Sequence, residues 1–240
     1  MPAQHSAIAT SACLRAALKR GLAREALRHA GLAEADMRAI FEVARQVRPN
    51  AKSVERVAGR LGGLSGMVRV ARRTDGGGLT LVLRNLRHLV SRAGAQKLFG
   101  ETALVYTRVQ VVQTRYGLGF DLLRASFCRH ALERLVERSD VALNRPLLAT
   151  VDAEAGALLR QFSRGRLIED AGNRLIAGVA KGVWAGGVDD TGLEEDWGLA
   201  FSDPASRIAV FFARTFLSPE EMRPTLWAKW QDDPAIRVAA

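Results

Sequence analysis

The sequence has few of the features that mark secreted or membrane proteins. Its 240 residues include two cysteines, Cys13 and Cys128, which are too few for a disulfide framework. No apolar run reaches the roughly 18 residues that a membrane-spanning helix needs, and residues 1–12 lack the basic-then-apolar pattern of a secretory signal. We therefore expect a cytoplasmic protein that makes no membrane contact.

Sequence motifs for metals and nucleotides are also missing. The cysteines and the histidines His29 and His88 do not have the spacing of metal ligands. The glycine run 76–78 is not followed by Lys-Ser/Thr, so it is no P-loop, and the acidic run 189–196 lacks the order of a calcium-binding loop. We expect no metal site and no cofactor.

Acidic and aromatic residues are scarce in the first hundred residues. Residues 1–100 hold 18 Lys and Arg against 6 Asp and Glu, a balance of +12, whereas the remainder holds 17 against 19, a balance of −2. Phe41 is the only aromatic residue before Phe99. Such a basic region predicts an acidic partner, most often the phosphate backbone of nucleic acid. An alternative stays open: arginine outnumbers lysine 30 to 5, and a GC-rich genome would enrich arginine without selection for binding.

Both composition shifts fall near residue 100 and suggest three regions. We expect a basic helical region over 1–98, an α+β domain over 99–230 and a C-terminal tail over 231–240. The tail follows the last apolar pattern of the chain.

Apolar spacing in the first region favours helices. Residues 8–47 show helical periodicity with a stop at Gly31, and a further helix is expected to begin near Ser53. A turn is expected over 74–78. Residues 79–98 are predicted to form a basic amphipathic helix. The residues expected to contact phosphates are basic ones on or near this region, together with one from a later helix: Arg72, Arg73, Arg84, Arg87, Arg92, Lys97 and Arg138.

The second region mixes strand and helix patterns. Residues 103–114 and 120–127 are predicted to form a hairpin, followed by helices over 129–138 and from about 144 to 162. Strand-like runs follow at 174–180, 183–188, 197–202 and 207–217. A capping box that starts at Ser218 then opens a helix to about Trp230. This order indicates an α+β fold with helices packed on an antiparallel sheet.

The helix predicted over 129–138 has a polar face that could carry chemistry. Leu132 and Leu135 fall on one side, and His130, Arg134 and Glu137 fall on the other. A histidine can move protons near neutral pH, and an arginine can bind a phosphate and stabilise negative charge. The alternative is that this face is simply the solvated side of an amphipathic helix.

The strand predicted over 207–217 contributes a second arginine. Strict alternation places Arg214 on the same face as Phe212 and Phe216, where it would interrupt an apolar surface, and Thr215 is its neighbour. The functional interpretation is an arginine that projects into a cleft. The alternative is an arginine near a strand end whose guanidinium extends to water.

The pattern His130-Ala131-x-x-Arg134-x-x-x-Arg138, followed by Arg214-Thr215-Phe216 on a strand, resembles small RelE-like toxin domains. These belong to a broad bacterial group of barnase-, colicin- and RelE-type ribonucleases. The resemblance covers about residues 100–230. It implies a metal-independent endoribonuclease in which His130 is the acid or base and Arg134 and Arg214 contact phosphate.

Three hypotheses follow from the sequence. The first is an RNA-directed protein with a ribonuclease site at His130, Arg134, Glu137, Arg214 and Thr215. The second is a non-catalytic nucleic-acid-binding or adaptor protein of a mobile element or phage. The third is a helical module that binds a protein partner.

Overall fold

A computed structural model describes the backbone of residues 2–73, 78–93, 96–114, 117–203 and 205–233, and the side chains of 12–73, 78–88, 100–112, 117–203 and 205–233. In this part of the chain, eight strands form one sheet in the order β1-β2-β3-β4-β8-β7-β6-β5. The strands are β1 (Met67–Arg72), β2 (Gly78–Ala93), β3 (Gln96–Thr114), β4 (Gly117–Cys128), β5 (Ile168–Asp170), β6 (Asn173–Ala177), β7 (Val183–Thr191) and β8 (Ile208–Leu217).

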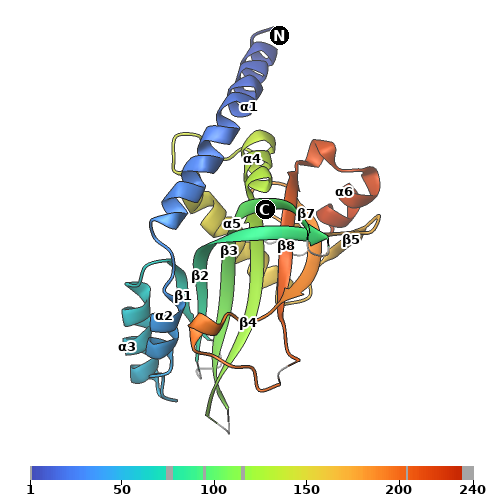
Figure 1. The fold of residues 1–240 in the computed structure, drawn as a ribbon. Helices are drawn as coiled ribbons and strands as arrows, with labels where there is room; N and C mark the ends of the chain where they lie inside the picture. Colours follow the sequence, from blue (N-terminus) through green and yellow to red (C-terminus); the bar gives the residue numbers. More distant parts are fainter. Residues whose placement is uncertain (1, 74–77, 94–95, 115–116, 204, 234–240) are drawn as a thin grey trace.

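Helices cover both faces of this sheet, and one helix extends away from it (Figure 1). The α-helices are α1 (Pro2–Gly31), α2 (Met37–Ala44), α3 (Ala51–Gly62), α4 (Arg129–Arg138), α5 (Leu147–Phe162) and α6 (Pro224–Gln231), and two short 3-10 turns are η1 (Glu195–Trp197) and η2 (Pro219–Glu221). The α+β class predicted from the sequence is confirmed.

The sheet is mixed, which corrects the expectation of a wholly antiparallel one. Neighbouring strands pair antiparallel except β4 and β8, which run parallel from Leu123–Ala209 to Phe127–Ala213. The chain leaves β4 through α4 and α5 and builds β5, β6 and β7 before β8 returns beside β4. A parallel neighbour requires such a long connection, because a short turn can join only antiparallel strands.

The prediction of a basic amphipathic helix over 79–98 is wrong, because β2 and the start of β3 occupy these residues. Leu79, Leu81 and Leu83 alternate into one buried cluster, and Val82 faces the opposite one. β2 pairs along its whole length with β3, and this non-local pairing overrides the helical spacing of the later leucines. The predicted boundary at residue 98 falls inside β3, and the strand β1 was not predicted.

Most of the other expected elements are confirmed. The stop at Gly31, the helix near Ser53, the hairpin of β3 and β4, the helices α4 and α5 and the strands β6, β7 and β8 all form close to their predicted bounds. The strand expected over 197–202 does not form: Trp197 is the last residue of η1, and residues 198–202 have no helix or strand. The capping box at Ser218 begins η2, and α6 begins separately at Pro224. Residues 74–77 of the expected turn and 234–240 of the expected tail lie outside the described residues.

The first face of the sheet carries the largest core. Alanines of α1 and the apolar sides of α4 and α5 pack there against aromatic side chains from four strands. Trp184 lies at the centre, with ring centroids 4.9 Å from Phe127 and 5.0 Å from Phe216. These contacts hold α4 and α5 at fixed positions on the sheet.

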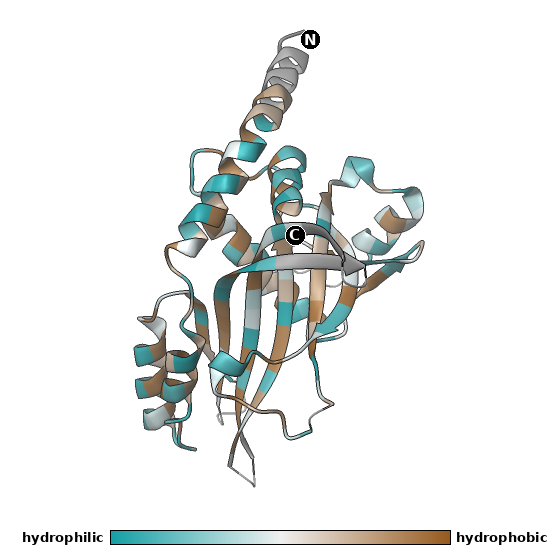
Figure 2. Ribbon diagram, in the orientation of Figure 1, coloured by the Kyte–Doolittle hydropathy of each residue, from teal (hydrophilic) through white to brown (hydrophobic). Residues whose placement is uncertain are grey.

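The second face is covered by α2, α3 and the loop that contains η1. Phe41 of α2 packs against Trp197 of η1 at 5.8 Å between ring centroids. The guanidinium of Arg124 lies 4.6 Å from the Trp197 ring and forms an ion pair with Glu194. Figure 2 shows hydrophobic and hydrophilic residues interspersed along α2 and α3, as expected for helices that bury one side. A smaller cluster under α6 completes the core.

A buried carboxylate anchors α5 to the turn between β6 and β7. Glu154 is 1% exposed. Its Oε1 accepts a hydrogen bond from the N–H of Ala180 at 2.6 Å, and its Oε2 accepts from the N–H of Val179 at 3.0 Å and from Nε1 of Trp184 at 2.9 Å. Three donors on one carboxylate fix where α5 lies along the sheet.

Candidate nucleic-acid interface

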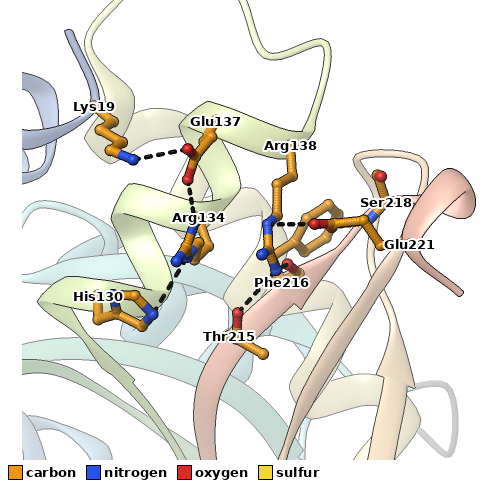
Figure 3. A network of polar contacts seen from close by, with 9 residues as sticks. All are labelled: Lys19, His130, Arg134, Glu137, Arg138, Thr215, Phe216, Ser218 and Glu221. Atoms are coloured by element: carbon orange, nitrogen blue, oxygen red, sulfur yellow. Dashed lines mark hydrogen bonds and ion pairs between the residues drawn. The ribbon is translucent and has the colours of Figure 1, made fainter. Parts of the chain in front are cut away.

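The polar face predicted on α4 forms as expected. Nε of Arg134 lies 3.3 Å from Nε2 of His130, and Nη1 of Arg134 lies 2.5 Å from Oε2 of Glu137. Lys19 of α1 reaches the other carboxylate oxygen of Glu137 at 2.7 Å. Figure 3 shows this chain of contacts along the outer side of the helix. The structure therefore brings three of the predicted site residues together.

Arg138 turns in another direction from the same helix. Its Nη1 donates to the carbonyl of Phe216 at 2.9 Å and lies 3.4 Å from Oγ1 of Thr215, while its Nε pairs with Glu221 at 2.9 Å (Figure 3). These contacts tie the end of α4 to the end of β8 and to η2. Nε and Nη1 of Arg138 are thus engaged inside the protein, so a phosphate at these two nitrogens would have to compete with Glu221 and the Phe216 carbonyl.

Arg214 does not interrupt an apolar face, which corrects the alternation predicted for its strand. Thr215 pairs with Ala185 and Ala213 pairs with Gly186, so Arg214 is the extra residue of a β-bulge. Ala213 and Phe216 both face the first core, while the side chain of Arg214 is exposed. In the described part of the chain, no hydrogen bond or ion pair joins Arg214 to His130, Arg134 or Glu137.

The titration of two groups near α4 limits the chemistry they can do. Partial burial raises the pKa of Glu137, but hydrogen bonds from Lys19 and Arg134 outweigh it and hold the pKa below its ordinary value. Glu137 therefore stays ionised at neutral pH and cannot donate a proton there. Burial raises the pKa of the Cys128 thiol, whose sulfur accepts a hydrogen bond from the N–H of Ala131. Cys128 caps the helix as a neutral thiol and is no activated nucleophile.

Several arginines expected to contact phosphate are engaged within the fold. Arg84 is buried and lies 2.6 Å from Asp152, which also accepts a hydrogen bond from the hydroxyl of Tyr106 at 2.7 Å. Arg87 lies 3.8 Å from Glu194. The Arg84 pair joins β2 to α5, and the Arg87 pair joins β2 to the loop before η1, so both guanidinium groups neutralise carboxylates of this protein. The side chains at positions 92 and 97 lie outside the described residues.

The other two predicted arginines, Arg72 and Arg73, line a basic hollow. It has a volume of about 360 Å³ and lies between β1, β2 and β3 on one side and the last turns of α5 on the other. Arg72 is exposed and pairs with Glu55 at 2.7 Å. Four more arginines line the same space: Arg69, Arg108, Arg160 and Arg164. We call this hollow, with these four arginines, the arginine pocket.

Strand register and helix spacing build the arginine pocket. Arg69 of β1 pairs with Val82 of β2, which pairs with Arg108 of β3, so the two arginines flank one valine in a row across the sheet. Arg160 and Arg164 are four residues apart on and just after α5, and therefore lie on one side of that helix. The space between them stays open because small side chains line it, namely Ala71, Thr80, Gly156 and Ser163.

The arginine pocket is strongly positive. Its lining includes no acidic residue. Among the described side chains, no carboxylate lies within ion-pair distance of the guanidinium groups of Arg69, Arg108, Arg160 or Arg164. Partial burial lowers the pKa of Arg108, and the nearby cations of Arg73 and Arg164 lower this pKa further. The carboxylate of Asp121 on β4 acts in the opposite direction and raises it. Partial burial also lowers the pKa of Arg160, with Arg69 and Arg164 adding to the effect. The four cations thus repel one another, and a bound anion would relieve that repulsion.

The sequence did not predict the four arginines that define the arginine pocket, and the reason is their separation along the chain. Residues 69, 108 and 160 are 39 to 91 positions apart in the sequence, and only the pairing of β1, β2 and β3 brings them together. The one local signal was the pair Arg160 and Arg164 at helical spacing. The lining also contains no aromatic residue, so it offers no aromatic ring on which bases could stack.

Within the described ranges, no group of three or more His, Cys, Asp or Glu side chains is placed to hold a metal ion. No helix there combines the length and the apolar character required to cross a membrane. Comparisons of the chain with protein-family models, with curated proteins and with solved structures gave no match.

Proposed function

We propose that this protein binds nucleic acid, RNA in the first place, through phosphate groups held by the arginine pocket. The observation that carries the proposal is the convergence of Arg69, Arg108, Arg160 and Arg164 on one hollow without an acidic lining residue. Repulsion between like charges destabilises a fold that gathers them, so an anionic ligand is the simplest explanation of such a cluster.

The residue type supports phosphate as that ligand. The planar guanidinium presents its donors as a fork that matches two phosphate oxygens at once, which an ammonium group cannot do. Because phosphate contacts carry no base information and no aromatic residue lines the pocket, recognition should depend little on sequence. It should depend strongly on salt, since each neutralised phosphate releases counterions.

Fluorescence anisotropy with a labelled single-stranded RNA tests the proposal across a salt series. The variant Arg160→Gln/Arg164→Gln removes two pocket charges, and Arg145→Gln/Arg207→Gln removes two exposed charges outside the pocket lining. If each arginine of the pocket neutralises one phosphate, the slope of log K against log salt should fall by about 1.4 in the pocket variant. The control should keep the slope of the unmodified protein. Equal slopes in all three proteins would reject the pocket as the binding site.

A ribonuclease is a second candidate, and the contacts of Arg134 with His130 and Glu137 favour it. In this mechanism His130 takes the proton of a ribose 2′-hydroxyl while that oxygen attacks phosphorus, and Arg134 stabilises the negative charge that develops on the phosphoryl oxygens. The 5′-oxygen leaves with a proton from a second group. The ionised Glu137 cannot supply that proton, and the described contacts do not bring Arg214 to this face.

Cleavage of labelled total RNA without added metal tests this second candidate. The unmodified protein is compared with His130→Ala and Arg214→Ala at matched folding, judged by circular dichroism. Loss of cleavage in both variants would support one shared site. Loss in His130→Ala alone would leave Arg214 outside the site, and absence of cleavage by the unmodified protein would reject the enzyme and leave the binding proposal standing.

A further inference from the structure

We infer that the arginine pocket takes a terminal phosphate of a nucleic-acid strand in preference to the phosphodiesters within it. This inference rests on the proposed function, because it names the part of the nucleic acid that the pocket would hold. It goes beyond that function, because a protein that grips strand ends acts at a different place from one that coats a strand.

The arrangement of the cations is the first argument. Arg69 and Arg108 stand two strands apart on the floor of the pocket, about 10 Å between their backbones. Arg160 and Arg164 lie one helical turn apart on the wall. The four arginines therefore line one half-open hollow from two sides. A protein that follows an internal backbone usually spreads its cations along an open track instead.

The charge and the number of oxygens are the second argument. A terminal phosphate monoester carries about −1.5 to −2 charges at neutral pH and three terminal oxygens, whereas an internal phosphodiester carries one charge. Several arginine forks can share three oxygens without competing for them. Thr80 and Gln110 line the same space, and the hydroxyl of Thr80 and the amide of Gln110 can donate further hydrogen bonds.

The mutual repulsion of the arginines is the third argument. Arg73 and Arg164 act on Arg108, and Arg69 and Arg164 act on Arg160. A ligand with the larger charge in the same volume relieves more of this repulsion. Asp121 of β4 opposes the cations at Arg108, but it is not part of the lining, and Glu55 occupies only Arg72 at the rim.

Three oligonucleotides of one sequence test the inference, each with an internal label. One carries a 5′-phosphate, one a 3′-phosphate, and one has hydroxyl groups at both ends. Anisotropy titrations use the unmodified protein, Arg160→Gln/Arg164→Gln and the control Arg145→Gln/Arg207→Gln. We expect the unmodified protein and the control to bind one phosphorylated strand at least tenfold more tightly than the hydroxyl strand. The pocket variant should lose this preference.

The outcomes separate this inference from the proposed function. Equal binding of all three strands, weakened in the pocket variant, would overturn the terminal-phosphate inference and keep the nucleic-acid proposal. No binding of any strand by the unmodified protein would overturn both. A terminal preference that survives in the pocket variant would place the end-binding site elsewhere and overturn the inference. Should the α5 variant unfold, Arg69→Gln on β1 makes the same test from the floor of the pocket.

Discussion

Replacement of Glu154 by alanine should be among the most destabilising single changes in this protein. Its carboxylate accepts hydrogen bonds from the N–H groups of Val179 and Ala180 and from Nε1 of Trp184. The alanine variant leaves the buried Nε1 of Trp184 and the two partly buried backbone N–H groups without this acceptor. Each buried donor left unsatisfied costs about 1–3 kcal/mol. Three donors at the lower end of that range amount to about 3 kcal/mol.

The length of the chain sets how far this loss of unfolding free energy lowers the Tm. For domains of this length, 1 kcal/mol corresponds to about 2–4 °C in Tm, so Glu154→Ala should melt about 6–12 °C below the unmodified protein. Glu154→Gln keeps the shape of the side chain and one of its two oxygens. Its amide N–H₂ group faces at least one N–H donor, which then has no acceptor, so the free energy of unfolding should fall by about 1–3 kcal/mol.

Thermal and urea unfolding, followed by circular dichroism, measure these losses. The matched control is Glu42→Ala on α2, which removes an exposed carboxylate that pairs with Arg38 at 3.5 Å. Such exposed pairs contribute about 0–1 kcal/mol. If Glu154→Ala melts within 2 °C of this control, the three hydrogen bonds do not anchor α5.

Two further predictions concern the carboxylates of Glu154 and Asp152. Burial raises the pKa of Glu154 above its ordinary value despite its three hydrogen bonds, so the folded state binds this proton more tightly than the unfolded state. Its contribution to stability is therefore fully present below the ordinary glutamate range and is lost as pH rises through the raised pKa. Stability relative to Glu154→Gln should thus increase when the pH is lowered from 7 towards 5 in urea titrations, and a decrease would contradict this sign. Asp152→Ala leaves Arg84 and the hydroxyl of Tyr106 without their acceptor, and should cost about 2–4 kcal/mol. Arg84→Met added to Asp152→Ala should restore part of that loss, and no recovery in the double variant would contradict the proposed pairing.

Local sequence patterns were sufficient for the elements whose partners are close in the chain. The leucines of α4 repeat at helical spacing, and the β-branched run of β3 is followed directly by β4, so a hairpin was predictable. The polar face of α4 formed for the same reason, because helical geometry alone places His130, Arg134 and Glu137 side by side.

The tertiary structure decided the features that depend on distant residues. The leucines of 79–98 fit both helical and strand spacing, and only the pairing with β3 selects the strand. The bulge at Arg214 exists only through its register with β7. The arginine pocket depends on strand pairing and on helix packing. Strand pairing places Arg69 and Arg108 on either side of β2, and the packing of α5 on the sheet brings Arg160 to the same hollow. The sequence by itself determined the basic composition and the local elements. The place where the charges converge followed from long-range strand pairing and helix packing, which local periodicity does not encode.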